Sequence, residues 1–154
     1  MPAQSTVNVT ITAITTPPDM GGVVTCSLSL PNGTDPNIKL NPNSSGVLTI
    51  VELTAPQNTA VQVTYNLANP TFGGYVFKLT QITLSPSAPP WISIGPDGVS
   101  IIDQNTQPPP APGKQPTPYE YSIYFDATAP LGGGGTCVWD PPIENENTPR
   151  PPNR

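Results

Sequence analysis

Apolar and polar residues alternate along most of this chain, and no other sequence feature constrains its fold as strongly. In TVNVTITAI, for example, Val7, Val9 and Ile11 alternate with polar residues. The pattern recurs in VVTCSLSL, GVLTIVEL, TAVQVTYNL, GYVFKLTQITL and YEYSIYFDA. Side chains two residues apart share one face of a β-strand, so each segment predicts a strand with one buried face. No window shows the 3.6-residue apolar period of an amphipathic helix.

The segments between these stretches are rich in turn-forming residues, and the chain contains 24 Pro and 13 Gly. GPDG separates WISIG from GVSIID and predicts a hairpin. The alternation changes phase near Gln81, which predicts a β-bulge. NTQPPPAPGKQPTP is typical of a stiff crossover loop. Together these features predict an all-β fold, a single immunoglobulin-like sandwich of about eight or nine antiparallel strands.

The length of 154 residues predicts one domain. We place the sandwich at residues 1–140 and an acidic, Pro/Asn-rich tail at residues 141–154. The tail, PPIENENTPRPPNR, cannot form a helix and barely forms a strand. We therefore expect it to dock on the domain or on a neighbouring molecule. Self-association through a sheet edge or through this tail is the interaction that such a chain favours.

Charge and composition exclude several classes of function. The net charge is −5 with only five basic residues, so we expect no nucleic-acid binding. No apolar stretch approaches the roughly twenty residues of a membrane helix, so we expect no membrane insertion. The start, MPAQSTVNVT, shows no signal peptide, which favours a cytoplasmic or virion-associated (assembly-associated) protein.

The absence of histidine removes Ser-His-Asp and Cys-His catalysis and every histidine-containing zinc site. The two cysteines, Cys26 and Cys137, are too few for a Cys₄ site, and we expect no cofactor. Both occupy alternating strand positions, which favours free, buried thiols over a disulfide bridge. Acid-base chemistry would fall to carboxylates, tyrosines or lysines.

Two Asp-Pro bonds occur, Asp140–Pro141 and Asp35–Pro36. An aspartyl carboxyl can attack its own backbone carbonyl through a five-membered ring, and a fold that fixes this geometry accelerates the reaction. Asp35–Pro36 sits in GTDPN, which is typical of a turn. Asp140–Pro141 follows a glycine run and an apolar strand and precedes an acidic segment, so it is the candidate reactive bond.

A second carboxyl near Asp140 would complete an acid-base pair. Glu120, Asp126 and Glu144 are rival candidates. If the last two strands form a hairpin, Asp140 at the far end of its strand faces Glu120 or Tyr121 more closely than Asp126. Contact with Asp126 would need a different pairing.

A small acidic all-β chain whose final strand runs into CVWDPPIENEN resembles the DP-EP family. The resemblance covers most of the chain at the level of fold and residues 119–147 at the level of motif. It implies a small β-sandwich protein from bacteria or phages that cleaves its own Asp-Pro bond, here Asp140–Pro141. It also implies hydrolysis or transfer of the Asp140 acyl group to a lysine, for which Lys78 is the candidate. No Glu-Pro dipeptide occurs in the chain.

Two other functions remain open from the sequence. One is a structural subunit of a virion, filament or surface assembly that uses its C-terminal tail as an interaction arm. The other is a ligand-binding sandwich with Trp91, Trp139 and the tyrosines of residues 119–124 as stacking platforms. Aromatic residues at alternating positions are more often part of the core.

Overall fold

The structure is a computed structural model that describes residues 3–15, 21–42, 48–54, 58–86, 88–106, 119–140 and 142–145. These residues form strands, turns and irregular segments. The strands, in chain order, are β1 (Ala3–Ile14), β2 (Val24–Ser29), β3 (Ile38–Pro42), β4 (Leu48–Leu53), β5 (Val61–Asn69), β6 (Thr71–Phe72), β7 (Tyr75–Leu84), β8 (Ile92–Ile94), β9 (Ser100–Asp103), β10 (Tyr119–Thr128), β11 (Gly134–Trp139) and β12 (Pro142–Asn145). No helix among the described residues is long and apolar enough to cross a membrane.

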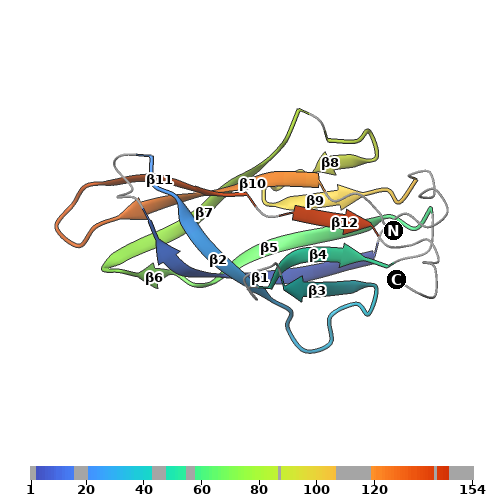
Figure 1. Ribbon diagram of the computed structural model, residues 1–154, viewed down its shortest axis with the longest axis horizontal. Coiled ribbons are helices and arrows are strands. Elements are labelled where there is room, and N and C mark those ends of the chain that lie inside the picture. Colours follow the sequence, from blue (N-terminus) through green and yellow to red (C-terminus); the bar gives the residue numbers. More distant parts are fainter. Residues whose placement is uncertain are drawn as a thin grey trace.

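The strands form two sheets (Figure 1). The five-stranded sheet has the order β2-β1-β5-β9-β8. The seven-stranded sheet has the order β3-β4-β12-β10-β7-β6, and β11 also pairs with β10. The two longest strands of this sheet, β7 and β10, pair with each other in its interior. β10 and β11 form a hairpin that extends to the left end of the view in Figure 1.

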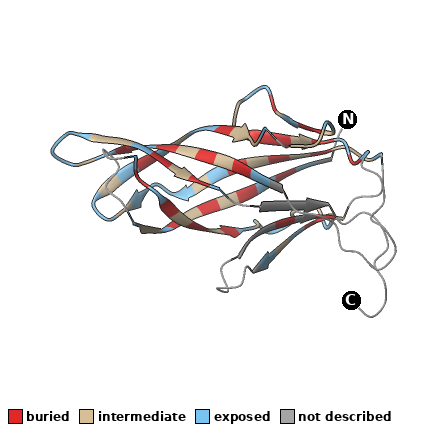
Figure 2. Cartoon of the chain, turned by 45° about the horizontal axis from the view of Figure 1, so that its top comes forward, coloured by how far each residue is buried: buried red, intermediate tan, exposed pale blue. Residues whose placement is uncertain are grey.

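The core is built from the apolar positions of the alternating segments, as Figure 2 shows by the red bands that recur along the strands. The sheets share one hydrophobic cluster, to which β1 contributes Val7 and Val9 and β10 contributes Ile123 and Phe125, each fully buried. An alternating strand can bury only one face in this way, so the opposite face remains polar. The all-β, sandwich-like class predicted from the sequence is confirmed.

Two details of the prediction are confirmed in the backbone. β8 and β9 pair antiparallel around the GPDG turn, with Ile94 opposite Ile101. The β7–β10 register shifts between Tyr124 and Phe125, which lie opposite Gln81 and Leu79, so the expected bulge lies at this point. An extra residue on one strand restores the buried face after the phase change near Gln81.

The topology differs from the expected eight or nine antiparallel strands. The described residues form twelve strands, and β1 pairs parallel with β5 while β12 pairs parallel with β4. The strands that the alternation did not indicate, β3, β6 and β12, have only five, two and four residues. Strand direction depends on how the chain crosses between sheets, which a period of two does not encode.

Cys26 and Cys137 are free thiols, and both are fully buried, as the sequence predicts. Burial, and secondarily the proximity of Cys137, raises the pKa of the Cys26 thiol far above its ordinary value. Burial also raises the pKa of the Cys137 thiol. Both side chains therefore behave as small, protonated core residues at neutral pH.

Candidate functional site

The β10–β11 hairpin depends on the glycine run LGGGG. Gly132 and Gly133 have φ angles of 87° and 84°, in the left-handed region that glycine adopts without strain. Gly134 approaches the opposite strand so closely that an added Cβ atom would lie 1.9 Å from the carbonyl oxygen of Ala127. The run therefore serves both as a turn and as a point of close backbone approach, and it sets the register of β11 on β10.

The strands β11 and β12 follow one another along the same edge of β10 in an unbroken register. Trp139 at the end of β11 lies opposite Ile123, and Pro142 at the start of β12 lies opposite Glu120. Asp140 therefore falls next to Ser122. Pro141, the other half of the candidate bond, lies outside the described residues. Asp140 thus follows β11 and precedes β12, and both of these strands pair with β10 in one register.

The carboxylate of Asp140 is held by a side chain of β10. The Ser122 hydroxyl donates a hydrogen bond to Oδ1 of Asp140 over 2.5 Å. Asp140 is exposed and Ser122 is half-buried, on the outer face of the sheet. A charge-assisted hydrogen bond of this kind fixes the rotamer of the carboxylate. Sequence reasoning missed Ser122 because it placed Glu120 or Tyr121 beside Asp140, an offset of one or two residues in the hairpin register.

Glu120 is the nearest of the three rival carboxylates. It is exposed, and alternation places it two residues from Ser122 on the same outer face of β10. Because Asp140 sits beside Ser122, Glu120 is its diagonal neighbour across the strand pair, a relation that corresponds to about 7–8 Å between Cα atoms. Side chains at this separation are within reach of one another.

The other two carboxylates lie elsewhere. Asp126 is opposite Thr136 and Lys78, four residues along β10 from Ser122, or about 13 Å at the usual strand rise. Glu144 is in register with Glu52 of β4, beyond Pro142 and further from Asp140 along the strand. In this register Glu120 is the diagonal neighbour of Asp140, whereas Asp126 and Glu144 occupy positions farther along the strands.

Lys78, the candidate acceptor, is exposed on β7 in register with Asp126. It lines a cavity of about 320 Å³ together with residues that include Tyr65, Phe77 and Leu79. This position is displaced from Asp140 both along the strands and by the width of β10. The Lys78 side chain therefore does not lie beside the Asp140 carboxyl of the same chain.

Beneath the outer face, two buried tyrosines join the sheets. The hydroxyls of Tyr65 on β5 and Tyr121 on β10 hydrogen-bond to each other, and the ring centroids are 5.5 Å apart. Burial raises the pKa of Tyr65 well above its ordinary value, and the bond to Tyr121 opposes this shift only in part. Tyr121 immediately precedes Ser122 on β10. The contact between Tyr65 and Tyr121 therefore holds in place the strand whose Ser122 bonds Asp140.

The second Asp-Pro bond, Asp35–Pro36, belongs to a tight turn, as the sequence predicts. The backbone N–H of Asn37 donates to Oδ1 of Asp35 over 2.9 Å. The N–H of Ile38 donates to the carbonyl oxygen of Asp35 over 3.0 Å. An Asp that begins a turn with Pro in the second position forms both bonds naturally.

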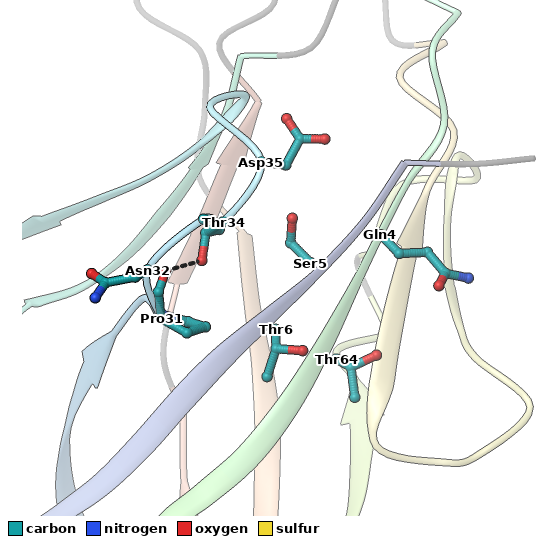
Figure 3. Close-up of a pocket in the computed structure, with 9 residues that line it drawn as sticks. Gln4, Ser5, Thr6, Pro31, Asn32, Thr34, Asp35 and Thr64 are labelled. Carbon is teal, nitrogen blue, oxygen red and sulfur yellow. Dashed lines mark hydrogen bonds between the residues drawn. The ribbon is translucent and has the colours of Figure 1, made fainter.

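Asp35 also lines a polar pocket of about 370 Å³ between the β2–β3 loop and the start of β1 (Figure 3). In this view the hydroxyl of Ser5 is directed toward Asp35. Ser5 is 9% exposed, and its Oγ atom has no hydrogen-bond partner among the residues that the structure describes. The pocket holds one carboxylate among hydroxyls and amides, and the sequence offered no signal for it.

The aromatic residues considered as ligand platforms are largely part of the core. Trp139 is 9% exposed and Tyr121 is 1% exposed. Trp91 is half-buried and packs against the core cluster. Trp139 and Tyr121 therefore do not present open faces on which a ligand could stack.

Comparison with known proteins adds no assignment: no protein-family model, no curated protein and no solved structure matches this chain.

Proposed function

We propose that this chain cleaves its own Asp140–Pro141 bond in a single turnover. The observation that carries the proposal is the Ser122–Asp140 hydrogen bond, between the end of β11 and the start of β12. A carboxylate held in one rotamer beside its own peptide carbonyl is a positioned nucleophile, and positioning of this kind lowers the barrier of an intramolecular attack. The bond would be cut by carboxyl chemistry without a cofactor.

The reaction has two steps. In the first, the free carboxylate oxygen of Asp140 attacks the Asp140 carbonyl carbon, and a cyclic anhydride forms as the carbon–nitrogen bond to Pro141 breaks. The proline nitrogen leaves as a secondary amine after it takes up a proton. In the second, water opens the anhydride and restores the Asp140 side chain with a new C-terminal carboxylate. One water molecule is consumed and one peptide bond is cleaved.

The neighbouring side chains have separate roles in this scheme. Ser122 bonds Oδ1 and leaves Oδ2 of Asp140 for the attack. Glu120, as the diagonal neighbour, donates the proton to the proline nitrogen and then activates the water. One carboxyl must be ionised while the other is protonated, so mildly acidic solution should favour the reaction.

The finer assignments belong to the same proposal. The immunoglobulin-like type of sandwich and membership of the DP-EP family are supported by the two-sheet architecture and by the motif CVWDPPIENEN. Transfer of the Asp140 acyl group to Lys78 of the same chain is disfavoured by the position of that lysine. Hydrolysis is therefore the outcome that we propose.

Intact-mass measurement on freshly purified, folded protein tests the cleavage. Incubation between about pH 4 and 8, where carboxyl pairs titrate, should produce a species that has lost residues 141–154, most rapidly at the acidic end. Asp140 should be the new C-terminus, and the Asp35–Pro36 bond should remain intact. A folded protein that keeps its full mass for days across this range would falsify the proposal.

The second candidate function is an assembly subunit without enzymatic activity. It is favoured by β12, which places part of the C-terminal segment inside the sheet instead of leaving it as a surface appendage. The two functions are compatible, because a segment that has been cut from its chain can remain bound as a strand. Light scattering across a range of protein concentrations tests this role, and a strictly monomeric protein would exclude it.

A further inference from the structure

The strand β12 occupies an unusual position for the C-terminal part of a chain. It lies between β4 and β10 within the seven-stranded sheet, as Figure 1 shows, and pairs with both. Its pairing with β4 is parallel and joins Ile143 to Val51 and Glu144 to Glu52. Its pairing with β10 is antiparallel and joins Ile143 to Tyr119. Without β12, the facing edges of β4 and β10 would have a gap one strand wide between them.

The described β12 pairings are short and local. They involve residues 142–145 only, with three register pairs to β4 and two to β10. Few backbone hydrogen bonds hold a strand of this length, so it opens at lower cost than the long β7–β10 pairing. The strand follows β11 closely in the chain, since β11 ends at Trp139 and β12 begins at Pro142.

We infer that the gap between β4 and β10 accepts β12 from a second copy of this chain, so that copies assemble by exchanging this strand. A swapped strand makes the same backbone pairings as it would make within its own chain. The swapped and unswapped forms therefore differ in free energy only through the segment that connects β11 to β12 and through the association of the two copies. Short connections favour such exchange. In the monomer, β12 pairs with β4 and β10 at the same time. It is therefore the segment that a second copy would supply to the same gap.

This inference specifies the assembly role proposed above and does not depend on cleavage. To separate the two, the test uses the full chain with Asp140→Asn, which removes the reacting carboxyl. Two variants that each add one cysteine, Glu52→Cys and Glu144→Cys, are made in that background. These positions are in register on adjacent strands, about 4.8 Å apart, which lies within the span of a disulfide. The native thiols are buried and protonated, so they do not compete.

The two variants are unfolded together, refolded and oxidised, and the products are separated by mass. Strand exchange predicts a disulfide-linked species of doubled mass that forms only in the mixture, since neither variant alone has both positions. The Glu52→Cys/Glu144→Cys double variant should form an internal disulfide in its monomeric fraction, which verifies that the substituted chain folds with β12 in place. A mixture of Glu144→Cys with Gln62→Cys, whose substitution lies in the other sheet, should give at least tenfold less of the doubled species.

Absence of the doubled species, with the internal disulfide of the double variant present, would overturn strand exchange. If light scattering then finds multimers, assembly proceeds through another surface and the broader assembly role stands. If it finds monomers only, exchange and assembly both fail. Absence of both the doubled species and the internal disulfide would also overturn the inference, because the β4–β12 register on which it rests would be wrong.

Discussion

The two Asp-Pro bonds of this chain are chemically identical, and the fold treats them differently. At Asp35, the carboxylate and the carbonyl accept hydrogen bonds from backbone N–H groups two and three residues further along the same turn. At Asp140, the carboxylate is bonded by the Ser122 hydroxyl of a neighbouring strand. The contacts at Asp35 hold both its carboxylate and its carbonyl in the turn. The contact at Asp140 orients the carboxylate, and Ser122 leaves the other carboxylate oxygen unbonded. The reactivity expected of a dipeptide therefore depends on which groups its carboxylate contacts.

The largest expected effect comes from Asp140→Asn. The amide is nearly isosteric but cannot attack as a carboxylate does, so cleavage at residue 140 should stop entirely. Asp35→Asn is the matched control and should leave the cleavage rate unchanged. Intact-mass spectra of the two variants, incubated beside the wild type, make the comparison. If both Asp-Pro bonds of the wild type are cut at equal rates, the Asp140–Pro141 bond has only the ordinary acid lability of an Asp-Pro bond.

Substitution of the partner carboxyl should have the next largest effect. Glu120→Gln keeps the side-chain shape and removes general acid-base catalysis, so the rate should fall by about 10²–10⁴-fold. Asp126→Asn, on the same face of β10 but about 13 Å along the strand, should have no effect. The measurement is the time course of peptide release by mass spectrometry. If Asp126→Asn slows cleavage and Glu120→Gln does not, the partner carboxyl is Asp126 and not Glu120.

The serine should matter less than either carboxyl. Ser122→Ala removes the hydrogen bond that orients Asp140, and an exposed bond to a charged group corresponds to roughly a tenfold change in rate. Ser122→Thr retains the hydroxyl and should restore most of the activity. The rates are compared at one pH in the same time-course assay. Equal rates for all three proteins would mean that the Ser122 contact does not position the carboxylate.

The smallest effect is expected at the other bond and concerns stability. Asp35→Ala removes the side-chain bond to the Asn37 N–H and should lower the free energy of unfolding by about 1 kcal/mol. Asp35→Asn can form the same bond and should stay close to the wild type. Urea denaturation of both variants in the Asp140→Asn background measures the difference without cleavage. If Asp35→Asn lowers the free energy of unfolding more than Asp35→Ala does, the turn-based explanation is wrong.

The sequence predicted what local patterns encode. Alternation located the main strands, the bulge near Gln81 and the hairpin that brings Asp140 back toward Glu120. The Asp35 turn was also readable, because its bonds join residues two and three apart. The remaining features depend on long-range geometry. The choice of Ser122 as the Asp140 partner follows from the hairpin register, which Gly134 sets through its close approach to Ala127. The parallel strand pairs and the β12 position depend on crossovers, which alternation does not encode.

The central position of β12 has a consequence for how the protein forms in the cell. β3 and β4 are synthesised before β10, and residues 142–145 follow both β10 and β11 in the chain. Because the described residues of β4 and β10 pair through β12, this sheet cannot close until β12 is available, and its formation requires contacts between distant parts of the chain. The facing edges of β4 and β10 therefore stay open until β12 has been synthesised, and nascent chains on one messenger are prone to pair with each other during this interval.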